Sequence, residues 1–167
     1  FTNASFFKKI FYLIIEKFTS IITDKFINVS KGTMETYLKY RIGNISKHHI
    51  IYSAFDVDKF RNANKSLALN DLRTDINLNN NPKVIVRLAR FERLKRYKDL
   101  IETFSKILHN FPNTILILVG DGELLLENKQ LSKKLNLEKN IIFTGFSNYP
   151  EKIIALADIC IMNSERE

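Results

Sequence analysis

An arginine and a lysine stand in the second half of the sequence at positions where they could bind an anion. Arg87 directly follows the segment KVIV (83–86), and Lys95 lies eight residues further on, just before a helix pattern begins. Arginine supplies a planar fork of donors, lysine a compact positive charge, and a helix N-terminus adds unpaired backbone N–H groups. This pattern favours a site for a phosphate group or a similar anion. The alternative is that the lysines and arginines of residues 87–98 form one solvated basic loop.

A glycine turn follows the next apolar segment. Residues 114–119 read TILILV, and Gly120-Asp121-Gly122 comes directly after them. A strand, a glycine turn and a helix are the parts of many phosphate sites. A dinucleotide fingerprint would need a third glycine at position 125, where the sequence has Leu125, so NAD or FAD binding is disfavoured. A simple strand-to-helix turn explains the two glycines equally well.

Further candidate residues follow the last two apolar segments of the chain. Phe146 comes after NIIFTG, and Ser164 comes after ICIMN with Glu165 and Glu167 close behind. In open parallel sheets, ligands bind beyond the carboxyl ends of the strands, so we expect these residues near the same edge. A glutamate there could accept hydrogen bonds from sugar hydroxyls, or it could be a solvated charge.

The elements that would position these residues alternate strictly between strand and helix. Four apolar segments and three helix patterns are expected: strands within 83–90, 114–119, 140–146 and 158–163, and helices within 97–111, 123–135 and 150–157. Continuously apolar strands that alternate with helices are typical of a parallel sheet covered on both faces. The predicted fold class is therefore α/β, with a Rossmann-like unit.

The first part of the chain has a similar but shorter pattern. Residues 5–23 have apolar side chains at a spacing of three and four, which predicts an amphipathic helix. Such a helix could lie on a membrane surface or pack on a sheet, and the strand-like segment 25–30 that follows favours the sheet. A second helix is expected from a cap near Gly32 and Thr33, with a strand within 48–55.

Residues 61–82 are rich in Asn, Asp and Ser and lack regular apolar spacing, which predicts a connector. The sequence also lacks an initiating Met, so we expect its first residue not to be the natural start. The apolar run of residues 11–15 is far shorter than the roughly 20 residues of a membrane-spanning helix.

The formal net charge of +8 suggests an anionic partner, which could be nucleic acid, an anionic membrane or a phosphorylated small molecule. No nucleic-acid-binding motif accompanies that charge. The single cysteine, Cys160, lies among apolar residues and is expected to be a buried filler. The three histidines, His48, His49 and His109, have no second ligand at zinc-like spacing, so no metal site is expected.

Taken in order, six segments resemble the group 1 family of nucleotide-sugar glycosyltransferases, which have the two-domain GT-B fold. They are DKFINVS, HHIIYSAFDVDKF, VRLARFERLKRYKDLIETF, ILILVGDGELLLE, LNLEKNIIFTGF and ALADICIMNSERE. The resemblance runs from about residue 20 to the end. It implies that both Rossmann-like domains are incomplete: 1–60 would be the C-terminal part of the acceptor domain with the interdomain connection, 61–82 a linker, and 83–167 the first half of the nucleotide-sugar domain.

The resemblance also implies roles for particular residues. Arg87 and Lys95 would be the catalytic pair that binds the donor diphosphate and stabilises it as the leaving group. The other donor-binding positions would be Phe146 at the nucleobase, Ser164 beside the diphosphate, Glu167 at the donor sugar, and Gly122 in a framework turn at the rim of the site. The spacing from Arg87 to Lys95 is longer than in the commonest family form.

The activity implied is transfer of a hexose from a UDP- or GDP-linked sugar to a glycan or lipid-linked acceptor, with retention of configuration and without a required metal or cofactor. It would serve cell-surface polysaccharide or lipopolysaccharide biosynthesis. The protein would be cytoplasmic, with contact to the anionic inner face of the membrane and no nucleic-acid partner. The alternatives are a non-catalytic remnant of such an enzyme and a basic nucleic-acid-binding module.

Overall fold

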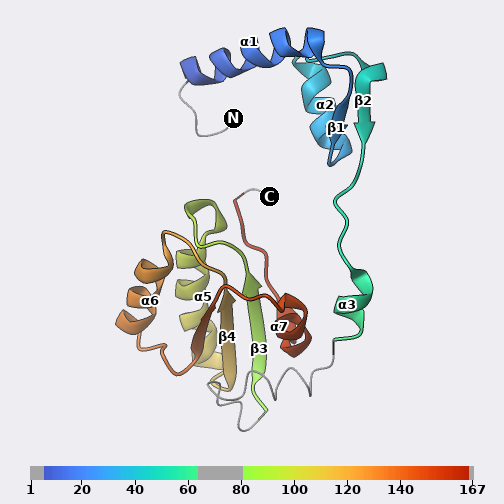
Figure 1. Cartoon of the computed structure of the whole chain (residues 1–167). Coiled ribbons are helices and arrows are strands. Elements are labelled where there is room, and N and C mark those ends of the chain that lie inside the picture. Colours follow the sequence, from blue (N-terminus) through green and yellow to red (C-terminus); the bar gives the residue numbers. More distant parts are fainter. Residues whose placement is uncertain (1–5, 64–80, 166–167) are drawn as a thin grey trace. The chain divides into compact units, whose positions relative to one another are not determined.

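The computed structural model describes residues 6–63 and 81–165. Glu167 and most of the predicted connector 61–82 lie outside the described residues. The contacts between residues divide the chain into two units, and the boundary in the sequence lies between Phe55 and Asp56 (Figure 1). The sequence suggests a first part that extends to residue 60, whereas the structure assigns the short helix that begins at Val57 to the second unit.

The first unit is a small α/β assembly around two parallel strands. Its elements are α1 (Phe6–Ile22), β1 (Phe26–Asn28), α2 (Lys31–Lys39), the 3₁₀ helix η1 (Ile45–Lys47) and β2 (His48–Ile50). The second helix begins slightly earlier than its predicted Gly-Thr cap, because the Ser30 side chain accepts a hydrogen bond from the Thr33 N–H at 3.1 Å. Phe26 of β1 pairs with His48 of β2.

His48 belongs to the interior of this unit. Its ring stacks on Phe26 with centroids 4.6 Å apart. The Asn28 side-chain nitrogen lies 3.1 Å from Nδ1 of His48, and Nε2 lies 3.0 Å from the carbonyl oxygen of Ile42. Both ring nitrogens therefore have protein partners, which gives this histidine a structural role.

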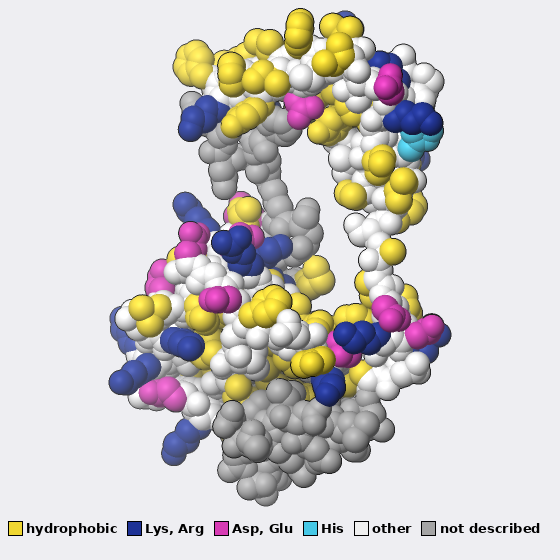
Figure 2. All heavy atoms as spheres, viewed as in Figure 1, with side chains coloured by type: hydrophobic (Ala, Val, Ile, Leu, Met, Phe, Trp, Pro, Cys, Tyr) yellow, Lys and Arg dark blue, Asp and Glu magenta, His cyan; other side chains and the backbone are white. Residues whose placement is uncertain are grey.

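Helix α1 is confirmed, but the expected packing of its apolar side chains on a sheet is not met in the part of the chain that the structure describes. Phe7 is 80% exposed, and Ser20 is the buried residue of this helix. Figure 2 shows hydrophobic side chains along the visible face of α1. Its C-terminal end is held by Lys47, whose Nζ donates to the carbonyl oxygens of Ser20 at 3.2 Å and Thr23 at 2.7 Å. A positive charge is favourable at that end of a helix.

The second unit is a four-stranded parallel sheet with helices on both faces, which confirms the predicted α/β class. Its elements are α3 (Val57–Arg61), β3 (Lys83–Leu88), the 3₁₀ helix η2 (Arg93–Lys95), α5 (Tyr97–Asn110), β4 (Thr114–Val119), α6 (Leu125–Lys134), β5 (Ile141–Gly145), α7 (Pro150–Leu156) and β6 (Ile159–Cys160). The strand order is β5-β4-β3-β6.

Two hydrophobic cores lie on opposite faces of this sheet. Helices α5 and α6 cover one face and α7 covers the other (Figure 1). Every residue of β4 is buried, as expected for a strand covered on both faces. At the other extreme, β6 leaves Cys160 exposed, so the prediction that this cysteine is a buried filler was wrong.

The strand order creates a topological switch point. The chain runs outward from β3 through β4 to β5, and then crosses back to place β6 on the other side of β3. All four strands are parallel, so their carboxyl ends meet at one edge. Loops that leave a sheet on both sides of such a point diverge, and ligands bind in the space between them.

We expect Phe104→Ala to destabilise the second unit strongly. Phe104 in α5 is 0% exposed and packs in the core between α5 and the sheet, so its removal leaves a cavity. The expected loss in the free energy of unfolding is about 3–5 kcal/mol, measured by urea denaturation. The matched control is Phe111→Ala at the end of the same helix, where the side chain is 65% exposed and the loss should stay below about 1 kcal/mol. Equal losses would contradict this description of the core.

Candidate functional site

A cavity of about 780 Å³ lies at the carboxyl edge of the second unit's sheet. It is lined by the ends of two strands and by the segments that follow three: residues 88–90 at and after the end of β3, 119–122 at and after the end of β4, and 146–147 after β5, together with Pro150 at the start of α7. Cavities of roughly 300–1,000 Å³ are typical of small-molecule sites. The cavity therefore stands where the fold predicts a ligand.

The glycine turn after β4 forms part of the cavity wall and is held by backbone contacts. A Cβ on Gly120 would lie 2.0 Å from the Ala89 carbonyl oxygen, and a Cβ on Gly122 would lie 2.5 Å from that of Phe91. The N–H of Phe91 donates to the carbonyl oxygen of Asp121 at 2.9 Å. Only glycine allows the two loops to approach this closely. The turn is therefore a framework element beside the cavity, which Gly122 lines.

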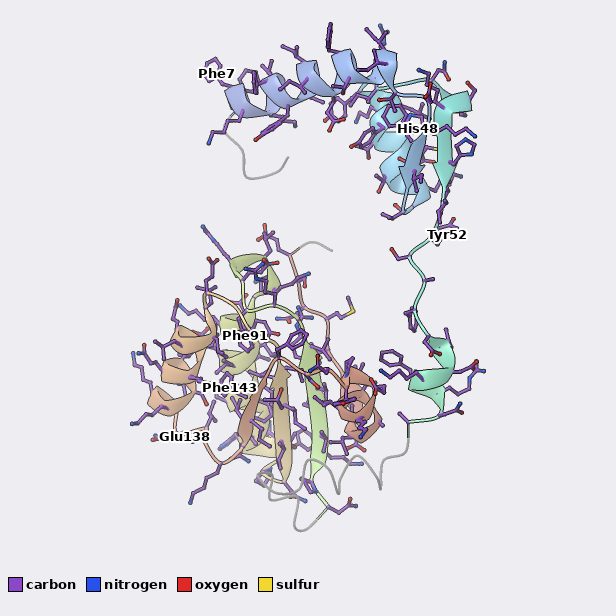
Figure 3. The ribbon with its side chains drawn as sticks, viewed as in Figure 1. Phe7, His48, Tyr52, Phe91, Glu138 and Phe143 are labelled. Carbon is purple, nitrogen blue, oxygen red and sulfur yellow. The ribbon has the colours of Figure 1, made fainter. Side chains whose placement is uncertain are left out.

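Aromatic rings support the loop that follows β3. Phe91 is fully buried and stacks on Tyr97, with centroids 3.9 Å apart and an interplanar angle of 12°. Phe143 of β5 lies on the same side, with its centroid 6.0 Å from that of Phe91 (Figure 3). The Tyr97 hydroxyl donates to the carbonyl oxygen of Ala89 at 2.6 Å. These contacts fix the backbone of residues 89–91 at the rim of the cavity.

The phenol of Tyr97 is shifted by its surroundings. Burial raises the pKa of Tyr97 to about 12, because it disfavours the charged phenolate. The nearby Arg87 guanidinium acts in the opposite direction, because a positive charge favours the phenolate, but it is outweighed. The phenol is thus neutral at ordinary pH and serves as a fixed donor.

The structure brings Arg87 and Lys95 together, but not as an open clamp. The side chain of Arg87 is 1% exposed and does not line the cavity. Its Nη2 lies 3.4 Å from the backbone carbonyl oxygen of Lys95 and donates to the Ser164 Oγ at 2.8 Å, while Nη1 donates to the Ile161 carbonyl oxygen at 3.0 Å. The Arg87 guanidinium therefore hydrogen-bonds to the chain's own oxygens in this structure, and its contact with the donor diphosphate stays a prediction.

The other predicted site residues divide into two groups. Gly122 and Phe146 line the cavity, and the Phe146 side chain is 75% exposed. Lys95 ends the 3₁₀ helix before α5 and, with Ser164, belongs to the cluster around Arg87. Glu167 lies outside the described residues. The part of each residue in donor binding stays a prediction.

Arg90 is the cationic residue that the sequence analysis missed. It lines the cavity and is exposed, whereas Arg87, earlier in the same segment, is buried. The sequence signal that could have drawn attention to Arg90 is its separation from Lys95. Arg87 precedes Lys95 by more residues than in the commonest family form, whereas Arg90 stands nearer to Lys95 in the sequence. The strand ends at Leu88, so Arg90 is also the first arginine beyond it.

Within residues 6–63 and 81–165, no cluster of three or more His, Cys, Asp or Glu side chains could hold a metal ion. Over the same described residues, no helix has the length and apolar character needed to cross a membrane.

The open parallel sheet, its switch point and the cavity beyond the strand ends define the class of Rossmann-like α/β domains. Residues 70–167 match the family "Glycosyl transferases group 1". The match covers more than half of the sequence, and the chain therefore belongs to this family.

Two curated relatives match over most of this chain. One is the N-acetylgalactosamine-N,N'-diacetylbacillosaminyl-diphospho-undecaprenol 4-alpha-N-acetylgalactosaminyltransferase of Campylobacter jejuni, which is 26% identical over 92% of this chain and 40% of its own length. The other is the UDP-Gal:alpha-D-GlcNAc-diphosphoundecaprenol alpha-1,3-galactosyltransferase of Escherichia coli, which is 27% identical over 93% of this chain and 41% of its own length.

Among solved structures, Anabaena HepE in complex with UDP and glucose aligns with a TM-score of 0.69 and 22% identity. The alignment covers 84% of this chain and 38% of HepE. This likeness shows the GT-B type of α/β fold. The chain spans about two fifths of the length of these proteins.

Because of the close backbone approach, we expect Gly120→Ala to lower the stability of the second unit by about 3 kcal/mol in urea denaturation. The new methyl group would collide with the Ala89 carbonyl oxygen. Gly145→Ala is the matched control, since Gly145 also has a positive φ of 72° but has open space where the new methyl group would lie. It should cost only about 1 kcal/mol, from backbone strain. Similar costs at the two positions would refute the steric argument.

The raised pKa of Tyr97 predicts a loss of stability at alkaline pH. An unfolded tyrosine titrates near pH 10, and folded Tyr97 near pH 12. The unfolded state therefore loses its proton first, and the contribution of Tyr97 is complete below pH 10 and declines as the pH rises from 10 to 12, by about 3 kcal/mol in total. Urea midpoints measured across this range should fall more steeply for the unchanged protein than for Tyr97→Phe. Parallel curves would show that Tyr97 is not the titrating group.

Proposed function

We propose that this chain carries the donor half-site of a glycosyltransferase that moves a hexose from a nucleotide-diphosphate sugar to a glycan or lipid-linked acceptor, with retention of configuration. The observation that carries the proposal is the cavity at the switch-point edge of a group 1 family member, with Arg90 and the glycine turn in its wall. The process served would be the biosynthesis of a cell-surface polysaccharide or lipopolysaccharide.

The cavity suits a nucleoside diphosphate. Backbone groups of the turn at residues 120–122 and of the segment after β5 supply polar atoms at its rim, and the exposed ring of Phe146 supplies an apolar surface. A nucleobase can pack on such a surface while hydrogen-bonding to backbone groups. The identity of the side chains does not reveal which nucleobase the backbone groups would bind. UDP and GDP are therefore both candidate carriers of the hexose.

Cationic groups would stabilise the departing diphosphate. Arg90 lines the cavity, and Lys95 stands just before the 14-residue helix α5, whose N-terminus carries a partial positive charge. Charge that develops on a leaving phosphate is stabilised by donors that are already in position. The proposed mechanism includes no required metal ion or cofactor, as the family resemblance implies.

The proposal extends to the acceptor and the location. The Campylobacter and Escherichia relatives are named for diphospho-undecaprenol acceptors, and this chain has a net charge of +8. A basic protein is attracted to the anionic inner face of a membrane. We therefore include in the proposal a lipid-linked or glycan acceptor, a cytoplasmic location and peripheral membrane contact.

Binding of UDP and GDP, with and without a hexose, tests the proposal by calorimetry. We expect one of the two nucleotides to bind, and Arg90→Ala and Lys95→Ala each to weaken it about tenfold or more, because each removes a charged donor to phosphate. The control is Arg61→Ala, whose exposed side chain pairs with Asp58 in α3.

A folded chain that binds neither nucleotide would contradict the proposal and favour the non-catalytic remnant. Strongly salt-dependent binding to generic RNA or DNA in its place would favour the nucleic-acid-binding module. Circular dichroism of each variant establishes that it is folded before its affinity is compared.

A further inference from the structure

A charged contact with α7 holds the short helix α3 on the second unit. Lys59 Nζ lies 3.3 Å from Oε2 of Glu151, and Figure 1 shows the two helices side by side. The partners differ in exposure, because the side chain of Lys59 is 49% exposed and that of Glu151 only 7%. A nearly buried carboxylate in α7 therefore has its positive partner on a separate element of the chain.

Helix α3 depends on tertiary contacts of this kind because it buries little surface of its own. None of its five residues, all of which the structure describes, is buried, although Phe60 is half-buried. Its N-cap is Asp56, whose side chain accepts a hydrogen bond from the Lys59 N–H at 3.0 Å. A helix this short does not form alone in water, so contacts with the rest of the unit must stabilise it.

Glu151 holds the other side of the contact, the first turn of α7. Three residues of α7 are buried: Glu151, Ile153 and Leu156. Ile153 and Leu156 belong to the apolar core between α7 and the sheet, whereas Glu151 carries a charge in the first turn. Burial of a charge costs free energy unless the charge is paired. The position of the first turn of α7 is therefore tied to the cation that α3 supplies.

The first turn of α7 is also part of the cavity wall. Pro150, which directly precedes Glu151, lines the cavity together with Ser147. The Ser147 Oγ accepts a hydrogen bond from the Tyr149 N–H at 3.1 Å, which shapes the loop that leads from β5 into α7. A shift in the first turn of α7 would therefore change the cavity on this side.

These contacts place α3 and a ligand in the cavity on two sides of the same turn. A ligand that contacts the wall at Pro150 favours the arrangement of this turn that it binds. Where that arrangement also keeps Glu151 against Lys59, the ligand strengthens the docking of α3. By reciprocity, docked α3 strengthens the binding of the ligand by the same factor.

We propose that the Lys59–Glu151 pair is a latch that couples the docking of α3 to occupancy of the cavity by a nucleoside diphosphate. Neither of these two described residues lines the cavity, so both are positioning residues that act through Pro150. Because α3 is the first element of the second unit, the point at which the chain enters this unit would respond to the ligand. The nucleotide in this inference rests on the proposed function, whereas the ion pair is a contact within the second unit.

The test compares substitutions at both ends of the latch in the full chain. Lys59→Met and Glu151→Gln each remove one charge at similar length, and Lys59→Arg keeps a cation of comparable reach. Arg61→Met is the matched control, because Arg61 lies in the same helix and its exposed pair with Asp58 does not involve α7. Two quantities are measured on each folded variant: amide hydrogen exchange in residues 57–62 with and without UDP or GDP, and the affinity for the nucleotide.

In the unchanged chain, we expect the nucleotide that binds to slow exchange in residues 57–62 about fivefold. Lys59→Met and Glu151→Gln should each speed this exchange, and each should lower the affinity for the nucleotide about fivefold. The double variant should lose no more than either single one, because both remove the same contact. Lys59→Arg should retain most of the coupling, and Arg61→Met should change neither quantity. The amides of β4 should stay protected throughout, which separates the latch from general stability.

Three results would overturn the proposal. Unchanged exchange in residues 57–62 of both Lys59→Met and Glu151→Gln would show that the pair does not hold α3, whether or not any nucleotide binds. Faster exchange with full nucleotide affinity would show that α3 is docked by the pair but is not coupled to the cavity. An equal loss of affinity in Arg61→Met would show that positive charge in general, and not the latch, is responsible.

Failure of the proposed function would look different. If the unchanged chain binds neither UDP nor GDP, the proposed function fails and the coupling to a nucleotide fails with it. The exchange measured without nucleotide still decides whether the pair of Lys59 and Glu151 holds α3 on α7.

Discussion

The complete burial of β4 is the constraint on which the rest of the second unit depends. A strand without an exposed face must be covered by helices on both sides, and each helix must return the chain to the same end of the sheet. The connections through α5, α6 and α7 do this, so the polar residues that follow the strands gather at one edge. The cavity, the glycine turn and the contacts of Arg87 with Lys95 and Ser164 are all consequences of that arrangement.

The positions of the strands and helices in this unit could be predicted because the signals were local. The segment TILILV is continuously apolar and became β4 without a shift, and the apolar spacing of residues 97–111 became α5 with one residue fewer. The GT-B type of fold followed from the order of six short segments. The first residue of α2 was harder to predict from the sequence, because Ser30 and the Gly-Thr pair that follows it can both cap a helix.

The side chains of the site were harder to predict, because a strand buried on both faces gives no alternation to read. Arg87 and Arg90 are both arginines near the end of β3, and only the structure shows that the first turns into the protein whereas the second lines the cavity. The exposure of Cys160 and of the apolar side chains of α1 could not be predicted for the same reason. An apolar sequence does not show which surface packs against it. Burial is a property of neighbours that are distant in sequence.

Backbone hydrogen bonds join the glycine turn to the loop after β3 and to the end of β5, and the Tyr97 hydroxyl adds a side-chain hydrogen bond to the Ala89 carbonyl oxygen. Ala89 N–H pairs with the Val119 carbonyl, Phe91 N–H with that of Asp121, and Gly120 N–H with that of Gly145. The geometry of the cavity wall therefore depends on the backbone, the glycines and the buried ring of Tyr97. Mutation can alter the chemistry at a position such as 90 while this frame stays intact. A fold of this design can diversify its ligands over evolutionary time without having to re-evolve its architecture.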